Sequence, residues 1–290
     1  MLEPIQIDPR TFLRQHCDLP VLPDVVSQIQ KALGESDIDL NKVAEMISSD
    51  SGILAQILKV VNSAYYGLPR EITKVRIAVS FLGLNEVYRI VLALSVVNTL
   101  KITEKKMLDK FWFHSFFAAT CTKYLGKKYQ PLLSSEELWA PSMLHDIGRL
   151  VYMKFFPDHY GALTDFCEKS GCTFSEAESH FSFPSSGYLG TLLCDHWRLP
   201  EPVRMACEFH TLKDLLSDRE DGSPKPLQQM VCLGNLLAVL SADYLNSDVK
   251  EQITDGVTTD LGLNEEEFLA LMGDIYELKI EVEGFMAQFS

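Results

Sequence analysis

The chain has 290 residues, 47% of them hydrophobic and 23% charged, so it can bury a substantial core and is not disordered by composition. Its 40 acidic and 26 basic side chains leave a net charge of -14, which disfavours direct binding to nucleic acid. The cysteines form no CxxC pair, and we find neither a signal peptide nor an apolar run long enough to cross a membrane. We therefore expect a reduced, cytoplasmic protein.

The first hundred residues carry apolar side chains at the i, i+3, i+4, i+7 spacing of amphipathic helices. Asp24 and Asn85 are placed to cap two of these helices, and the segments around Gly67 and Gly83 predict turns between them. The predicted buried stripes are Val25, Val26 and Ile29; Leu40, Val43, Ala44 and Ile47; Leu54, Ile57, Leu58 and Val61; and Val87, Ile90, Val91 and Leu94.

The second part of the chain continues in the same way. An aromatic helix is predicted from about residue 110, and Ser134 begins another in which Pro141 marks either a kink or the true first turn. Asn264 and Glu267 predict a capping box for a last helix. Further helices are expected near 158–169, 186–197, 201–210 and 228–244, and a loop at 217–226. No segment alternates with the period of a strand, so the predicted class is all-α.

The segment MLHDIGRLV, residues 143–151, contains the strongest candidates for site residues in the sequence. His145 and Asp146 are adjacent polar residues in what reads as an apolar helix, where they need a partner or a metal ion. Imidazole and carboxylate together suit zinc, iron or manganese. A buried hydrogen-bonded His–Asp pair would give the same sequence, so both interpretations stay open.

Three other histidines are candidates to join this pair. His114 lies on the polar edge of the aromatic helix, and it is a candidate metal ligand only if it faces His145. His196 and His210 lie near predicted helix ends, where a polar side chain is favoured in any case. We interpret Glu176 and Glu178 as solvated helix residues. No P-loop, GxGxxG or GxSxG motif is present, so no nucleophilic or phosphate-cradling site is predicted.

Four segments together resemble the HDOD domain, a bacterial signalling branch related to HD-type phosphohydrolases. They are LPVLPDVVSQIQKAL, the long run from VAEMISSD to GLNEV, MLHDIGRL and CDHWRLPEPV, and the resemblance covers roughly residues 19–212. It implies an N-terminal helical subdomain (1–105) packed on an HD-like helical subdomain (106–247). The acidic extension 248–290 lies outside it.

The resemblance also implies where a metal would lie in hydrolytic relatives. His114 fits the early helix histidine, and His145 with Asp146 fits the signature pair. Elsewhere the expected ligands are replaced: Ser185, Phe209 and Asn235 stand at the positions that we align with ligands, and His210 follows as a possible pocket residue. A hydroxyl and a neutral amide are poor substitutes for imidazole and carboxylate on such an ion.

The sequence therefore favours a non-catalytic regulatory domain that binds protein partners or a small ligand, with no residue assigned a catalytic role. Its partners would be other signalling proteins acting in trans, neither nucleic acid nor membrane. No cofactor is expected, although His114, His145 and Asp146 could retain one iron, manganese or zinc ion. The alternative is a metal-dependent phosphohydrolase acting on nucleotides or cyclic dinucleotides. The acidic residues of 248–290 read as a solvated face, or as a docking face for a basic partner.

Overall fold

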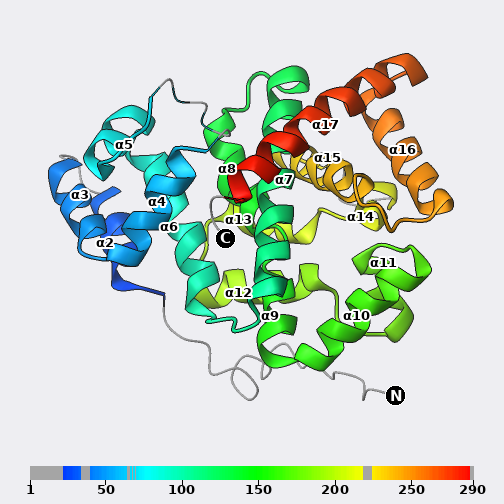
Figure 1. Ribbon diagram of the computed structural model, residues 1–290, viewed down its shortest axis with the longest axis horizontal. Coiled ribbons are helices and arrows are strands. Elements are labelled where there is room, and N and C mark those ends of the chain that lie inside the picture. Colours follow the sequence, from blue (N-terminus) through cyan, green and yellow to red (C-terminus); the bar gives the residue numbers. More distant parts are fainter. Residues whose placement is uncertain are drawn as a thin grey trace. The chain divides into compact units, whose positions relative to one another are not determined.

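The computed structural model describes residues 22–33, 40–63, 66, 68, 70–217 and 224–287. Within these residues every regular element is a helix and none is a strand, which confirms the all-α class (Figure 1). Three residues of the 62–67 segment and most of the predicted 217–226 loop lie outside the described part. The chain divides into two compact units, an N-terminal unit within 20–101 and a C-terminal unit within 102–286.

The N-terminal unit is built around α6, which is buried on nearly every side and packs against α2, α4 and α5. Asn85 does not cap this helix: α6 begins at Leu84, directly after Gly83, whose φ of +82° favours glycine. The helices of the unit are α2 (Asp24–Leu33), α3 (Leu40–Ser48), α4 (Ser51–Val61), α5 (Val75–Leu82) and α6 (Leu84–Thr99).

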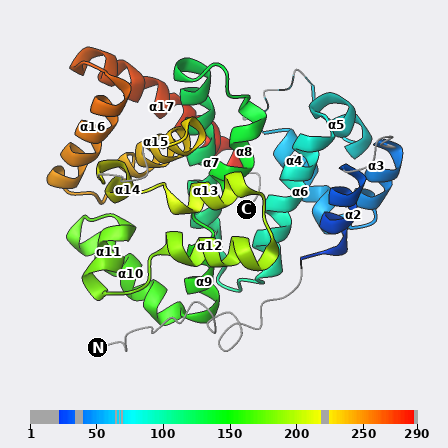
Figure 2. The same cartoon turned by 180° about the vertical axis from the view of Figure 1, so that it is seen from behind.

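The C-terminal unit is organised by the long helix α7, which packs against α8, α15 and α17. Helix α12 packs against α9 and α13, and Figure 2 shows these shorter helices from behind. The helices are α7 (Lys105–Tyr129), α8 (Ser135–Leu144), α9 (Gly148–Phe155), α10 (Pro157–Ser170), α11 (Phe174–Phe181), α12 (Ser186–Trp197), α13 (Glu201–Glu208), α14 (Leu212–Leu216), α15 (Pro226–Leu240), α16 (Ser247–Leu261) and α17 (Glu265–Met286).

Local signals placed several of these helix ends. Ser134 caps α8 by accepting a hydrogen bond from Glu137 N, and Pro141 lies within the helix. The capping box at the start of α17 is confirmed, with Glu267 N donating to Asn264 Oδ1 at 3.0 Å and Asn264 N donating to Glu267 Oε2 at 2.9 Å. Such contacts span three residues, so a sequence pattern suffices to predict them.

Two glycines allow helix backbones to come unusually close in the C-terminal unit. A Cβ added at Gly148 would lie 1.8 Å from Ser186 O, where α9 meets α12. A Cβ at Gly234 would lie 2.1 Å from Thr122 Oγ1, where α15 meets α7. Because any larger residue would force these helices apart, the two glycines set the spacing of the helices that surround the site below.

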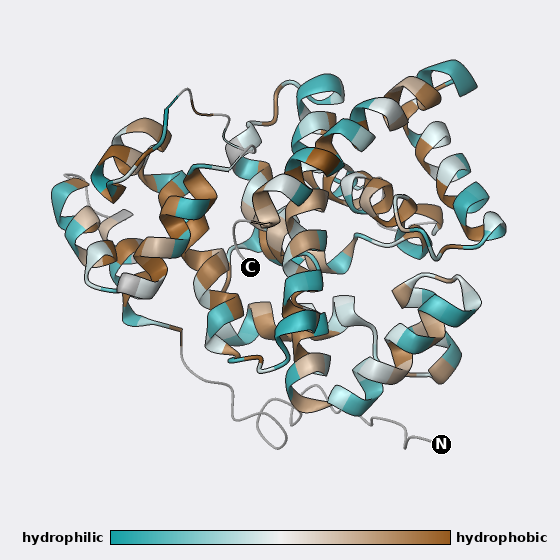
Figure 3. Cartoon of the chain, viewed as in Figure 1, coloured by the Kyte–Doolittle hydropathy of each residue, from teal (hydrophilic) through white to brown (hydrophobic). Residues whose placement is uncertain are grey.

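Helix α17 covers one side of α7 with a narrow apolar stripe. Phe268, Leu271 and Ile275 of α17 are buried, and the Phe285 ring packs edge-on against Phe116 of α7, with centroids 5.1 Å apart. The hydropathy colouring of Figure 3 shows apolar and polar bands alternating along α17. Among the described residues, no helix combines the length and the apolar character that a membrane span needs.

Candidate functional site

His145 and Asp146 lie at a break between two helices, and the expectation that they sit inside one helix is wrong. Helix α8 ends at Leu144 and α9 begins at Gly148. The connection tightens through i to i+3 hydrogen bonds, with Ile147 N donating to Leu144 O at 3.1 Å and Arg149 N to Asp146 O at 2.9 Å. Both side chains are fully buried.

Asp146 is the centre of a cluster of imidazoles, which we call the Asp146 cluster: Asp146, His114, His145, His210 and Arg149. Asp146 Oδ2 lies 3.3 Å from His114 Nε2 and 3.4 Å from His145 Nε2, and Oδ1 lies 3.2 Å from His210 Nε2. The Arg149 guanidinium lies 2.9 Å from Oδ2. The structure thus brings three of the candidate histidines to one carboxylate, from α7, the α8–α9 turn and the residue pair after α13.

Backbone contacts determine which ring nitrogens face the carboxylate. His145 Nδ1 lies 2.5 Å from Ser142 O, and His210 Nδ1 lies 3.0 Å from Cys207 O. Because a carbonyl oxygen only accepts, each Nδ1 carries a proton and donates it. In a neutral ring, Nε2 then directs its lone pair at the Asp146 carboxylate. This repulsive contact is removed by a shared cation or by an added proton. Histidines that bind metals are oriented in the same way, with the second nitrogen donating to a carbonyl.

Charges within the Asp146 cluster follow from its surroundings. Burial alone would raise the pKa of Asp146, but Arg149 and His145 outweigh it and hold that pKa well below its usual range. Burial, with the charges of Arg149 and His145, lowers the pKa of His114 more than Asp146 raises it, so this imidazole tends to the neutral form. For His210 the pairing with Asp146 outweighs burial, and the pKa is raised.

The donor set fits a single divalent cation. His114 Nε2, His145 Nε2 and both oxygens of Asp146 are buried and make no well-aligned hydrogen bond. Ligand atoms of His114, His145 and Asp146 lie within 4.8 Å of one another, the one such group found in the described part of the chain. The opposing feature is Arg149, a permanent cation beside Oδ2 that is held over the Phe174 ring at 4.4 Å.

The other predicted positions are only partly at this cluster. Ser185 is exposed, and its hydroxyl caps α12 by accepting from Tyr188 N, so it does not lie at a ligand position. Asn235 borders the cluster: its Nδ2 donates to His210 O at 2.7 Å. Phe209 is buried at the end of α13, next to His210. His196 is exposed on α12 and takes no part.

Arg149 and Glu178 also lie at the cluster, and neither is predicted as a site residue from the sequence. Arg149 follows Asp146 by three residues, so the helical spacing was a usable signal. Glu178 was interpreted as solvated, and this is wrong: it is buried and accepts a hydrogen bond from Ser186 N at 2.7 Å. Burial raises its pKa to about 7, despite the opposing hydrogen bond from Ser186 and the charge of Arg149.

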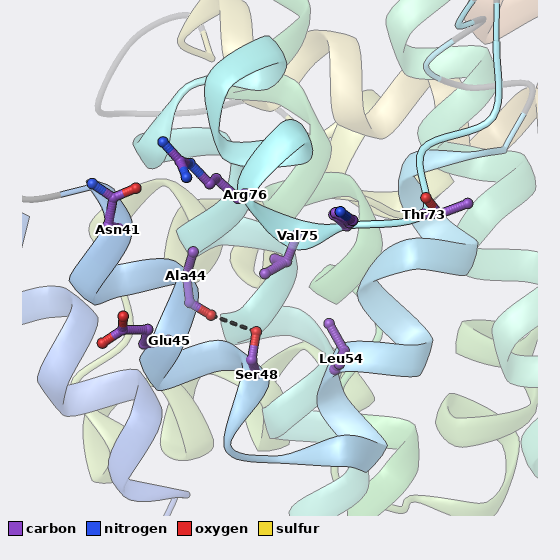
Figure 4. Close-up of a pocket in the computed structure, with 9 residues that line it drawn as sticks. Asn41, Ala44, Glu45, Ser48, Leu54, Thr73, Val75 and Arg76 are labelled. Atoms are coloured by element: carbon purple, nitrogen blue, oxygen red, sulfur yellow. Dashed lines mark hydrogen bonds between the residues drawn. The ribbon is translucent and has the colours of Figure 1, made fainter.

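The N-terminal unit contains a separate open depression of about 500 Å³ (Figure 4). Its lining combines basic and acidic side chains, Lys74 and Arg76 with Glu45, and most of these are exposed. Ser48 Oγ donates to Ala44 O at 2.6 Å, which turns that hydroxyl toward its own helix. No group of metal ligands occurs there, and the one such group among the described residues lies at the Asp146 cluster.

A model of the HDOD domain family matches residues 19–212 of the chain. An uncharacterised protein of Treponema pallidum (strain Nichols) is 26% identical over 196 residues, which are 67% of this chain and 37% of that protein. The chain thus spans well under half the length of this curated relative.

Solved structures share the fold at low sequence identity. An HDOD domain protein of unknown function from Geobacter sulfurreducens has a TM-score of 0.69 at 20% identity, with 96% of each chain covered. A Shewanella amazonensis protein whose name proposes a metal-dependent phosphohydrolase has a TM-score of 0.63 at 20% identity, covering 94% of this chain and 96% of that one. A Marinobacter aquaeolei protein whose name proposes signal transduction has 0.67 at 20%, covering 98% and 62%.

Proposed function

The chain belongs to the HDOD domain family, and on that premise we propose that it is a regulatory binding domain whose Asp146 cluster does not hydrolyse phosphoesters. The observation that carries this proposal is the ion pair between Arg149 and Asp146, with 2.9 Å between Nη2 and Oδ2. Asp146 is the one carboxylate of the cluster, and a guanidinium already compensates its charge. A catalytic cation would have to share that carboxylate with a permanent positive charge.

The ligands for a second ion are also missing from the described residues around the cluster. Asn235 offers a neutral amide, and its nitrogen is engaged by the His210 carbonyl. Ser185 points its hydroxyl at the backbone of α12. Two-metal hydrolysis uses two ions that hold the attacking and the leaving oxygen, and this donor set supports one ion at most.

A hydrolase that uses one metal ion is the second candidate, and the orientation of His145 and His210 favours it. His114 and His145 through Nε2, together with Asp146, would hold the ion, and His210 would contact the other oxygen of Asp146. Such an ion, when bound, lowers the pKa of a water ligand and supplies a nucleophile. Solvent reaches the cluster only at its edge, because His145 and Asp146 are fully buried while the side chains of His114 and Arg149 are 19% and 20% exposed.

The regulatory proposal includes the binding partners and the location of the protein. We propose that the domain binds other signalling proteins in trans, or a small ligand, in the cytoplasm. Its support is the helical surface that the fold provides beside a cluster poor in catalytic ligands.

Metal content and turnover of the purified chain test the proposal together. Metal is measured after dialysis against Zn²⁺, Mn²⁺ or Fe²⁺, and hydrolysis is followed on p-nitrophenyl phosphate, nucleotides and cyclic dinucleotides. We expect at most one ion per chain and no turnover above that of a His145→Ala variant. Metal-dependent turnover that disappears in His145→Ala and persists in the exposed control His196→Ala would establish the hydrolase instead.

A further inference from the structure

Helix α17 presents a second apolar stripe on the side that faces away from α7. Leu269, Tyr276 and Ile280 are 63%, 62% and 47% exposed, although side chains of this kind are usually buried. With Gly273 they follow a spacing of four, three and four residues, which places all of them on one line along the helix. We call this line the outer stripe of α17.

The outer stripe lies opposite the stripe that anchors the helix. At 100° per residue, Leu269, Gly273, Tyr276 and Ile280 fall within about 60° of one another. Phe268, Leu271 and Ile275, which are buried, point to the other side. An amphipathic surface helix needs only one apolar face for its own packing, so the outer stripe is not explained by the fold.

Acidic side chains border the outer stripe on both edges. Glu265 and Glu283 lie along one edge, and Glu266, Glu277 and Glu281 along the other, all of them exposed. No ion pair with a lysine or arginine is found for any of these five in the described part of the chain. The basic residue of the helix, Lys279, donates to Ser241 O at 3.0 Å and is turned toward α15.

Gly273 leaves a gap in the middle of the outer stripe, because it has no side chain. A Cβ added at this position would have nothing within 4 Å, so the surface there is open to an approaching side chain. A knob from a second helix can sit over a glycine, between the side chains four residues before and three residues after it. From Leu269 to Ile280 the stripe runs for roughly 17 Å, about three helical turns.

We propose that the outer stripe of α17 docks a basic amphipathic helix of another protein. The apolar side chains of that partner would lie along Leu269, Tyr276 and Ile280, and its lysines or arginines would face the glutamates on the two edges. Apolar burial supplies most of the affinity in such a contact, and the flanking charges select the partner.

The charges of the edges decide between this partner and other occupants. A second copy of the chain would set glutamates against glutamates on both edges, which like-charge repulsion opposes. An anionic membrane surface would be repelled in the same way. The surface lies outside residues 19–212, and its test does not involve the Asp146 cluster, so failure of this proposal and failure of the regulatory assignment are observed separately.

Fluorescence anisotropy of a labelled amphipathic peptide tests the proposal on the full chain. The peptide carries leucines at the four-three spacing and lysines at the flanking positions, over about five helical turns. Its counterpart has glutamate in place of each lysine. We expect the lysine peptide to bind, the affinity to fall with salt, and the glutamate peptide not to bind.

Two variants locate the binding. The combined variant Leu269→Ala, Tyr276→Ala and Ile280→Ala should bind the lysine peptide about tenfold more weakly, or worse. The control Leu132→Ala, at a side chain 98% exposed between α7 and α8, should leave this affinity unchanged. Alanine favours helix, so the triple variant keeps α17. As an independent check, Glu266→Lys, Glu277→Lys and Glu281→Lys together should also weaken binding.

Three results would overturn the proposal. The first is unchanged peptide affinity in the triple alanine variant. The second is a wild-type dimer in sedimentation that the triple variant dissociates, which would assign the stripe to a second copy. The third is binding of the wild type to vesicles with an anionic surface that the triple variant loses.

Discussion

Arg149 Nη2 lies 2.9 Å from Asp146 Oδ2, and Asp146 is fully buried while the arginine reaches the edge of the cluster. Asp146 lies in the α8–α9 turn and Arg149 in the first turn of α9, three residues later, so the pair joins residues that are close in sequence. Three imidazoles face the same carboxylate. The competition between the guanidinium and a metal ion for Asp146 therefore decides what the site can do.

Replacing Arg149 with methionine should have opposite effects on the metal-free protein and on metal binding. The buried charge of Asp146 loses its permanent partner, and we expect the free energy of unfolding in EDTA to fall by about 3 kcal/mol. Zn²⁺ should bind about tenfold more tightly, because the competing cation is gone. Urea unfolding and calorimetric titration measure the two effects.

Arg204→Met provides the matched control for that change. Arg204 also makes ion pairs, at 3.2 Å with Asp195 and 2.9 Å with Glu208, but at the surface. We expect a loss below about 1 kcal/mol and no change in Zn²⁺ affinity. Equal losses for the two arginine variants would contradict the role given to Arg149.

Glu178 should make stability fall as the pH rises toward neutrality. Burial raises its folded-state pKa from 4.5 to about 7, so the folded protein holds the proton more tightly than the unfolded chain. The stabilisation is complete below the unfolded pKa and is lost as the pH passes through the folded one. We expect the free energy of unfolding of Glu178→Gln, measured in urea, to rise by about 3 kcal/mol relative to that of wild type as the pH goes from 5 to 8.

The exposed Glu251 of α16 is the control for this pH effect. Glu251→Gln should follow the wild-type pH dependence throughout the same range. If Glu178→Gln does so as well, Glu178 is ionised at little cost in the folded protein.

Gly148→Ala should be strongly destabilising, since its Cβ would lie 1.8 Å from Ser186 O. Moving α9 away from α12 costs about 3 kcal/mol or more, and the variant should melt at much lower temperature or fail to fold. Gly161→Ala in α10 meets nothing within 4 Å and should be neutral or more stable by up to about 1 kcal/mol. Similar melting temperatures for the two variants would exclude the close approach.

Ser185→Ala should remove a helix cap and leave metal binding unchanged. Its hydroxyl accepts a hydrogen bond from Tyr188 N at 3.2 Å, and loss of such a cap costs about 1 kcal/mol. Urea unfolding measures the loss, and a Zn²⁺ titration should match that of wild type. A weaker Zn²⁺ affinity in this variant would place residue 185 at the cluster after all.

Much of the fold was predictable because its signals are local. The caps at Ser134 and at Asn264 depend on contacts across three residues, and the predicted helix 186–197 agrees with α12. Errors occurred where packing overrides local preference. Asn85 reads as a cap, yet α6 begins one residue earlier. In α4 the predicted Ile57 and Val61 are buried, but Ile53 and Val60 are buried beside them in place of the predicted Leu54 and Leu58.

By itself the sequence determined the helical class, the family resemblance and the chemical identity of the His145–Asp146 pair. Tertiary structure decided which other side chains reach that pair, because the answer depends on contacts between distant segments. It brought His114 and His210 to Asp146, from 32 and 64 residues away along the chain, and left Ser185 outside. It also buried Glu178, whose carboxylate looks solvated in a polar stretch until α12 packs over it. Spacing along a helix cannot report such contacts, since they arise only when α7, α12 and α13 close around the turn.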